Sequence, residues 1–228
     1  LAVELLHNFT LIHDDIQDQS QLRHGHPTLW RQYGVAQAIN AGDALFAIAQ
    51  MAMLDLMRTR NEKLAAQAAL KLNQVCLHLT RGQYLDIAFE KDDAIQIESY
   101  LDMIRGKTAA LIAFSTSLGG MIANQHPDIL DLLSNYGESL GMAFQIQDDY
   151  LGIWGDTAVT GKSAASDLLT KKKSLPVLYG LQHCPEFHEA WREEGVGAAA
   201  VEQMAEMLRA CGADDYVNQQ TEIYTKRA

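Results

Sequence analysis

The chain has 228 residues, of which 48% are hydrophobic and 21% charged, the composition of a soluble globular protein with one or at most two domains. A formal net charge of −11 argues against nucleic acid or an anionic membrane as a partner. No signal peptide is visible, every long apolar run has polar interruptions, and the three widely spaced cysteines indicate neither a disulfide framework nor a zinc site. We therefore expect a cytoplasmic protein without a membrane span.

Helical periodicity recurs along the whole chain, and no run of alternating β-branched residues predicts a strand. Glycine, proline and polar clusters separate the expected helices, which cover residues 1–21, 33–58, 61–89, 94–105, 107–123 and 128–154, with more after residue 177. The expected fold class is all-α, with residues 1–228 in a single helical domain. Leu1 lies inside an amphipathic helix and the last residues are still helical, so we expect this domain to lack its N-terminal helices and the end of its C-terminal helix.

Three helices carry patterns that predict their environment. Residues 34–46 are almost wholly small or apolar, which predicts burial in a core or at a subunit interface, with Asp43 as a hydrogen-bonded structural residue. In two later helices the apolar residues recur at helical spacing. The expected buried stripes are Leu64, Ala68, Leu72, Val75 and Leu79 in helix 61–89, and Leu132, Leu140, Phe144 and Leu151 in helix 128–154, where Gly137 and Gly141 allow close helix approach.

The strongest chemical signal is a pair of acidic clusters. Asp14, Asp15 and Asp18 follow an apolar run, with Asp14 and Asp18 one helical turn apart. Like charges repel, so the helix alone does not account for this cluster, whereas Mg²⁺ prefers carboxylate oxygens. Asp148 and Asp149 close a second apolar helix far down the chain. Facing one another across a cavity, the two clusters would form a metal–diphosphate site.

Basic residues stand near both clusters in an otherwise acidic chain. Arg23 can fold back toward the first cluster as a phosphate fork, or lie on the surface near the helix end. Lys107 and Thr108 follow a glycine and suit anion binding, although their surroundings lack the glycine spacing of a P-loop. Residues 155–166 predict a loop long enough to act as a lid. The lysine run 171–173 is either a solvated face or part of a diphosphate site.

Other acid-rich helical proteins fit less well. A di-iron carboxylate bundle needs two Glu-x-x-His pairs, and Glu4 with His7 supplies only one. His13-Asp14 is similar to the dipeptide of metal phosphohydrolases, but the further histidine ligands of those enzymes cannot be assigned. A purely solvated acid cluster would not explain why both clusters terminate strongly apolar helices.

Several motifs together resemble the trans-isoprenyl diphosphate synthases (the polyprenyl synthetase family). Asp14-Asp15-Ile16-Gln17-Asp18 is similar to the first aspartate-rich motif of that family, and Asp148-Asp149-Tyr150 to the second. The resemblance covers nearly the whole chain. Further segments that follow in the family's order and spacing are Arg23-His24-Gly25-His26-Pro27-Thr28, Gly42-Asp43, Gly82-Gln83 with Asp86, Gly106-Lys107-Thr108, Gly161-Lys162 and Lys172-Lys173-Ser174-Leu175-Pro176.

The resemblance implies a head-to-tail prenyltransferase that condenses isopentenyl diphosphate with an allylic diphosphate. It also implies a bundle of antiparallel helices around a central cavity, usually in a homodimer. Three Mg²⁺ ions bridge the aspartate motifs and the allylic diphosphate in this family, which by position implies metal ligation by Asp14, Asp18 and Asp148, with Asp15 and Asp149 as ligands or their supports. The residues that match those holding the allylic diphosphate are Arg23, Lys107, Gln145, Lys162 and Lys172.

Other matched positions concern the chemistry, the second substrate and the product. Thr108 matches a residue that supports the reaction, and His7 one that touches isopentenyl diphosphate. Phe9 lies five residues before Asp14, about 7.5 Å along the helix, where an aromatic commonly limits the growing chain. Thr10 is not aromatic and the first motif has no insertion, a combination that resembles synthases of the C20 product, geranylgeranyl diphosphate. Products of C15 or C25, and a role of Phe9 in core packing alone, are the alternatives.

The chain departs from the family's pattern at three places. Gly152 replaces the last acid of the second motif, and His24 stands where a second arginine commonly grips isopentenyl diphosphate. The family's N-terminal basic motif would precede Leu1, so we expect the allylic diphosphate to bind better than the second substrate. A class I terpene cyclase, whose Asn/Ser/Glu triad is missing near Asp148, and a non-catalytic partner subunit of a prenyl synthase are the alternative functions.

Overall fold

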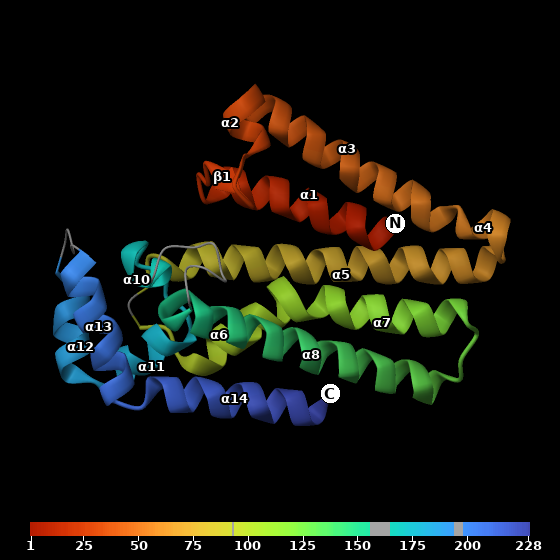
Figure 1. The fold of residues 1–228 in the computed structure, drawn as a ribbon. Helices are drawn as coiled ribbons and strands as arrows, with labels where there is room; N and C mark the ends of the chain where they lie inside the picture. Colours follow the sequence, from red (N-terminus) through yellow and green to blue (C-terminus); the bar gives the residue numbers. More distant parts are fainter. Residues whose placement is uncertain (93, 156–164, 194–197) are drawn as a thin grey trace. The chain divides into compact units, whose positions relative to one another are not determined.

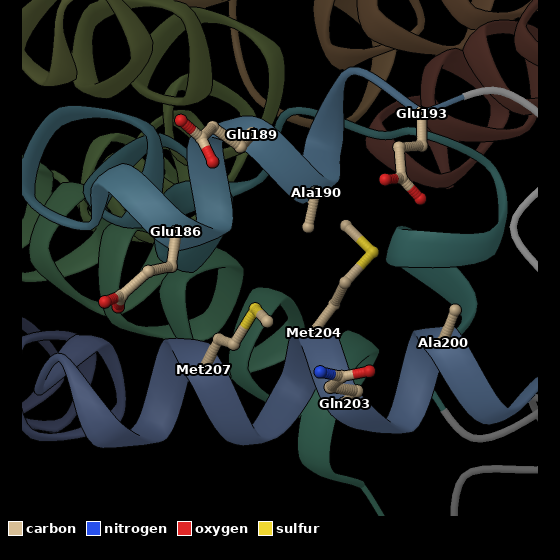
Figure 2. Close-up of a pocket in the computed structure, with 8 residues that line it drawn as sticks. All are labelled: Glu186, Glu189, Ala190, Glu193, Ala200, Gln203, Met204 and Met207. Carbon is tan, nitrogen blue, oxygen red and sulfur yellow. The ribbon is translucent and has the colours of Figure 1, made fainter.

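The computed structural model describes residues 1–92, 94–155, 165–193 and 198–228, and within these ranges the chain is almost entirely helical (Figure 1). The all-α prediction is confirmed. In chain order the elements are α1 (Ala2–Gln17), β1 (Leu22–Arg23), β2 (His26–Pro27), α2 (Leu29–Tyr33), α3 (Val35–Leu54), α4 (Leu56–Thr59), α5 (Glu62–Phe89), α6 (Ile97–Ile104), the π-helix η1 (Arg105–Ala109), α7 (Ala110–Ile122), α8 (Pro127–Trp154), α10 (Ser166–Leu169), α11 (Leu175–His183), α12 (Pro185–Trp191), α13 (Ala198–Ala210) and α14 (Ala213–Arg227).

Two compact units make up the chain. Unit 1 comprises Leu1–Leu77 and Phe114–Leu133, and unit 2 comprises His78–Ala113 and Ser134–Ala228. The first acidic cluster therefore belongs to unit 1 and the second to unit 2.

In unit 1, helices α1 and α3 lie side by side. At Gly42 of α3, an added Cβ would lie 2.4 Å from Nε2 of His13 in α1. A larger residue at this position would have to displace the imidazole ring, and overpacking of this kind destabilises a fold. Gly42 is therefore a requirement of the α1–α3 contact, next to the first acidic cluster.

Helix α3 is buried on one face only, so the expectation of burial on all sides is wrong for this chain by itself. Its buried residues are Ala38, Gly42, Ala49 and Met53. Within the described ranges, Val35–Thr59 is also the one helical stretch long and apolar enough to cross a membrane, a property shared by core helices of soluble proteins. An exposed apolar face is what the other alternative, a subunit interface, requires. The large apolar side chains exposed on α3 are Val35, Ile39, Ile48, Met51 and Leu54.

A short hairpin follows α1, where the sequence predicted a turn but no strand. The helix ends at Gln17 rather than at residue 21, and β1 pairs with β2 in antiparallel register. The two residues between them, His24 and Gly25, have φ angles of 50° and 78°, the left-handed pair that suits a two-residue hairpin turn. The hydroxyl of Thr28 and the indole N–H of Trp30 both donate to the carbonyl of Ser20 at 2.8 Å, which fixes the hairpin to the end of α1.

The segment between α6 and α7 remains helical, although the sequence predicted a break at Gly106. Residues Arg105–Ala109 form a π-helix, a rare wide turn that is frequent at functional sites. Gly82 of α5 makes room for this turn, because a Cβ there would lie 2.3 Å from the backbone nitrogen of Lys107. The backbone of η1 is therefore seated directly on α5.

The stripe prediction succeeds for α5 and fails for α8. Ala68, Leu72 and Leu79 of the predicted α5 stripe are buried. In α8 the predicted stripe is exposed, with Leu132 at 63% and Phe144 at 62% exposure. The observed buried face of α8 is a different one, made of glycines, apolar residues and one acid: Gly137, Gly141, Met142, Ala143, Ile146, Asp149, Gly152 and Ile153.

The C-terminal part of unit 2 packs around α11. This helix contacts α12 and α14, and its residues Leu175, Val177 and Leu178 are almost completely buried. Phe187 of α12 and Leu208 of α13 complete a second apolar cluster beside it. Burial at the N-terminus of α11 is important for the site, because this helix end contacts Asp149 of α8.

Candidate active site

The first acidic cluster lies at the C-terminal end of α1 and is partly neutralised by Arg23 of β1. The guanidinium Nε donates to Oδ1 of Asp15 at 2.9 Å, and Nη2 lies 2.8 Å from Asp15 and 3.4 Å from Asp14. Burial opposes the charge of Arg23, but its hydrogen bonds and ion pairs with Asp15 and Asp14 outweigh this effect and raise the pKa of the guanidinium. Asp15 is buried and paired, whereas Asp14 is partly exposed and Asp18 exposed. Arg23 thus folds back onto the acids, as one of its two interpretations required.

Phe9 packs between α1 and α3. Its ring centroid lies 4.7 Å from that of His13 and 5.3 Å from that of Phe46. Thr10 donates its hydroxyl to the carbonyl of His7 at 2.7 Å, and the side chain of His7 is exposed. Phe9 is therefore one helical turn before His13 in α1. This is the position, ahead of the first acidic cluster, where the sequence predicted the limit on chain length.

Asp43 does not have the buried, structural environment that the sequence predicted. Its side chain is 65% exposed, and Oδ1 lies 3.7 Å from Nε2 of His13. The expectation failed because it assumed that α3 is buried all round, while Asp43 stands on the open side of that helix.

In the second acidic cluster, Asp149 is completely buried and accepts hydrogen bonds from three elements. Its carboxylate accepts from the hydroxyl of Tyr100 in α6, from the backbone N–H of Leu175 at 3.1 Å and from Nε2 of Gln145 at 3.1 Å. Asp148, its neighbour, is only partly buried. The two adjacent acids therefore differ in environment: Asp149 joins α6, α8 and α11, and Asp148 retains contact with solvent.

Burial raises the pKa of Asp149 to about 6, although Lys172, the hydroxyl of Tyr100 and the N–H of Leu175 all oppose this shift. A carboxyl group with a raised pKa in the folded state stabilises the fold fully below its unfolded pKa, and this contribution is lost as the pH rises through the folded value. The relevant window is therefore pH 4 to 7.

We expect this titration to be visible when the wild type is compared with the Asp149→Asn variant, because the amide of the variant cannot ionise. In metal-free buffer, the free energy of unfolding of the wild type relative to the variant should fall by roughly 3 kcal/mol between pH 4 and pH 7. Urea denaturation at several pH values measures this difference. A difference that stays constant across the window would contradict the burial argument for Asp149.

Lys107 and Thr108 project from the π-helix to two other helices. Nζ of Lys107 lies 2.5 Å from Oδ2 of Asp86 in α5, and the hydroxyl of Thr108 donates to Oε1 of Gln145 in α8 at 2.8 Å. The sequence placed Asp86 only within a segment that resembles the family and did not indicate this partner, 21 residues away. The π-helix thus brings Lys107, Thr108, Gln145 and Asp86 into one network within unit 2.

Lys172 lies in the electrostatic field of the same network. Lys172 is exposed to solvent, but protein atoms surround it closely enough to oppose its charge; the neighbouring carboxylates outweigh this effect and raise the pKa of its ammonium, in the order Asp149, Asp167, Asp86 and Asp148. The sequence did not single out Asp167. Its carboxylate occupies the space beside Gly152, where an added Cβ would lie 2.5 Å from Oδ2 of Asp167. Where the family's second motif ends in an acid, this chain has glycine and a buried carboxylate contributed by α10.

Lys162 and most of the proposed lid, residues 155–166, lie outside the described residues. Within the described ranges, no three His, Cys, Asp or Glu side chains lie close enough to hold one metal ion. The chemistry of the donor set nevertheless fits Mg²⁺, because Asp14, Asp18 and Asp148 offer hard carboxylate oxygens and none of the three is buried.

Comparison with known proteins places this arrangement in a family. The profile of the family described as Polyprenyl synthetase matches residues 1–211. A geranylgeranyl diphosphate synthase of Mycobacterium tuberculosis is 43% identical over 79% of this chain and 51% of its own length. A geranylgeranyl pyrophosphate synthase of Geoglobus acetivorans is 35% identical over 100% of this chain and 70% of its own length. The crystal structure of a polyprenyl synthetase from Streptomyces coelicolor A3(2) superposes with a TM-score of 0.91 at 34% identity, covering 99% of this chain and 69% of that one.

The chain spans about half the length of the mycobacterial relatives that it matches. The family match nevertheless extends over both acidic clusters, the π-helix and the lysine run. The chain belongs to the polyprenyl synthetase family.

Proposed function

We propose that this protein is a Mg²⁺-dependent prenyltransferase that joins isopentenyl diphosphate head to tail to an allylic diphosphate. The observation that carries the proposal is family membership over residues 1–211 together with both aspartate pairs and the lysines that match the family's diphosphate ligands. Relatives named as geranylgeranyl diphosphate synthases, at 43% and 35% identity, support a C20 product. A (2E,6E)-farnesyl diphosphate synthase at 40% identity makes C15 the second candidate.

For the metal we propose Asp14, Asp18 and Asp148 as ligands of three Mg²⁺ ions, because these carboxylates are accessible. Asp15 and Asp149 have a supporting role, since both are buried: Oδ1 of Asp15 is bonded to Arg23, and both oxygens of Asp149 accept hydrogen bonds from the protein. When bound, Mg²⁺ supplies charge stabilisation for the diphosphate that leaves as the allylic C–O bond breaks.

The protein's own cations complete the site for the allylic diphosphate. Arg23, Lys107 and Lys172 each have carboxylates as neighbours within their own unit. We propose that their charges bind the diphosphate together with its metal ions. Gln145 and Thr108, which are hydrogen-bonded to each other, are positioned to support the reacting end of the allylic chain. Lys162 is assigned to the same diphosphate by its match to the family.

For isopentenyl diphosphate we propose His7 and His24, both exposed in the structure. A neutral imidazole has one N–H donor, whereas an arginine offers a charged fork of five. We therefore expect the second substrate to bind more weakly than the allylic one. In the reaction its alkene forms the new C–C bond at the allylic carbon, and a proton is then lost to the departing diphosphate, as the family resemblance implies. The apolar residues around this carbon must exclude water, because water would hydrolyse the allylic cation.

Phe9 is the proposed limit on chain length, and its replacement tests the C20 assignment. Truncating Phe9 to alanine removes the ring that lies between His13 and Phe46 and opens space below the first acidic cluster. We expect the Phe9→Ala variant to make products longer than those of the wild type, measured by reversed-phase chromatography of the dephosphorylated alcohols. Thr10→Ala, on the next position of α1, is the matched control and should leave the product length unchanged. Products no longer than those of the wild type would assign Phe9 to core packing alone.

We also propose a homodimer in the cytoplasm. The exposed apolar residues of α3 supply a surface that a second copy could cover, and the free thiols of Cys184 and Cys211 suit a reducing compartment. Sedimentation velocity should give twice the mass of one protomer.

One incubation tests the proposed activity. The full-length protein is mixed with Mg²⁺, labelled isopentenyl diphosphate and a C5, C10 or C15 allylic diphosphate, and the products are sized. A linear C20 diphosphate is the expected result. A cyclic hydrocarbon would instead assign a class I terpene cyclase, and no product with any starter would favour the non-catalytic subunit.

A further inference from the structure

The three lysines between α10 and α11 do not form a uniform patch: Lys172 is exposed to solvent, whereas Lys171 and Lys173 are partly buried. Lys171, Lys172 and Lys173 are adjacent, yet their side chains have three different environments. Lys172 lies in the field of the active-site carboxylates, while the ammonium groups of its two neighbours bind backbone carbonyls of other elements.

Lys173 binds the C-terminal end of α5. Its Nζ donates to the carbonyls of Phe89 at 3.2 Å, Glu90 at 3.2 Å and Asp92 at 2.8 Å. Phe89 is the last residue of α5, whose final carbonyls have no partner within the helix. A cation at this position also interacts favourably with the helix dipole. Lys173 thereby ties the lysine run to the helix that carries Asp86.

Lys171 binds the C-terminal end of α12 in the same way. Its Nζ donates to the carbonyls of Trp191 and of Glu193, the latter at 2.9 Å, and lies 4.9 Å from the centroid of the Trp191 ring. The backbone of Lys171 has a φ of 55°, in the left-handed region that residues with a side chain rarely adopt. Glycine would be the natural residue here, so the contacts of the lysine side chain must offset the cost of this conformation.

We propose that Lys171 and Lys173 are positioning residues, two clamps on either side of Lys172 that direct its ammonium into the diphosphate site. Lys173 binds the C-terminal end of α5 and Lys171 binds that of α12. The short connection between α10 and α11 is therefore fixed on both sides of Lys172. Of the three lysines, only Lys172 then contacts the diphosphate. This assignment rests on the proposed function, because that function gives Lys172 an anionic ligand.

The test replaces each lysine with methionine, which keeps the length of the side chain and removes its donor. The probe is inorganic diphosphate with Mg²⁺, titrated calorimetrically into the full-length protein, so that the result does not depend on turnover. Lys91, an exposed lysine next to the carbonyls bound by Lys173, supplies the matched control Lys91→Met. Hydrogen exchange of the backbone amides reports on each clamp separately.

We expect Lys172→Met to lower the affinity for diphosphate most, by about 100-fold. Lys171→Met and Lys173→Met should lower it about three- to tenfold, with faster exchange near residues 190–193 in the first and 89–92 in the second. Lys171→Gly should keep the fold, because glycine accepts the positive φ, and should still lose affinity. Lys173→Arg, which retains donors for the carbonyls, should restore most of the affinity. Lys91→Met should behave as the wild type.

Two results would overturn the proposal. Unchanged affinity in both clamp variants would reduce Lys171 and Lys173 to structural contacts. A loss equal to that of Lys172→Met, without faster exchange, would mean that all three lysines contact the anion directly. Failure of the proposed function is a different outcome: Lys172→Met would then bind diphosphate as the wild type does.

Discussion

Replacing Asp148 with asparagine is expected to lower turnover by about 100-fold or more. Asp148 is the accessible acid of the second cluster, while its neighbour Asp149 is buried and bonded to Tyr100, Leu175 and Gln145. An amide keeps the size of the side chain but loses the charge that, under the proposed function, would hold Mg²⁺ beside the leaving diphosphate. Loss of one group that stabilises developing charge typically costs about 10²–10³ in kcat. Steady-state rates at saturating substrate, measured across a Mg²⁺ titration, provide the number.

The control for this variant lies on the same helix. Asp128, in the first turn of α8, is 85% exposed and lies beside His126, so Asp128→Asn removes a carboxylate from α8 outside the second acidic cluster. This variant should keep full activity. If Asp148→Asn is as active as Asp128→Asn, the second acidic cluster does not bind the catalytic metal.

Gly82→Ala is expected to destabilise the fold by about 3 kcal/mol, at the upper end of the usual cost of overpacking. The new methyl group would lie 2.3 Å from the nitrogen and 2.7 Å from the Cα of Lys107, and backbone atoms cannot move aside as a flexible side chain can. The π-helix would have to move away from α5, and Lys107 would lose its position beside Asp86. Thermal unfolding and the KM for the allylic diphosphate report the two effects.

Gly119 of α7 is the matched control, because a Cβ there would meet nothing within 4 Å. Gly119→Ala should stabilise the protein by roughly 0.5–1 kcal/mol, the usual gain from replacing glycine within a helix. Equal effects of the two substitutions would show that η1 is not seated on α5 as the structure indicates.

The comparison of α5 with α8 shows what periodicity can and cannot predict. In α5 the predicted stripe lies on the buried face: Ala68, Leu72 and Leu79 are buried, Leu64 and Val75 are partly buried, and apolar residues outside the stripe, such as Leu70 and Leu77, are exposed. In α8 the buried face combines Met142, Ile146 and Ile153 with glycines and Asp149, and it is not the face that carries the predicted stripe. The spacing of large apolar residues therefore did not predict the helix face that carries the buried, hydrogen-bonded Asp149.

The site shows the same division. The acids, Lys107 and Gln145 could be proposed as site residues from their motifs, since residue type and order are properties of the sequence. Their partners could not: Asp86 reaches Lys107 from another helix, and Asp167 fills the space beside Gly152 from α10. Such pairs depend on tertiary packing, and no local spacing within the chain encodes them. For α3 the sequence left two alternatives, a core and a subunit interface, because composition alone does not distinguish a core from a surface that a second chain would cover. Within the single chain, one face of α3 is exposed.

The wide turn at Arg105–Ala109 contains one residue more than an uninterrupted α-helix would need. Deletion of one residue within it would let α6 continue into α7 as a regular α-helix, with regular backbone hydrogen bonding throughout. Every side chain after the deletion would rotate by about 100° around the axis, however, and the lysine and threonine would face elsewhere. The extra residue thus serves to direct the side chains of Lys107 and Thr108, since the helix itself would be more regular without it.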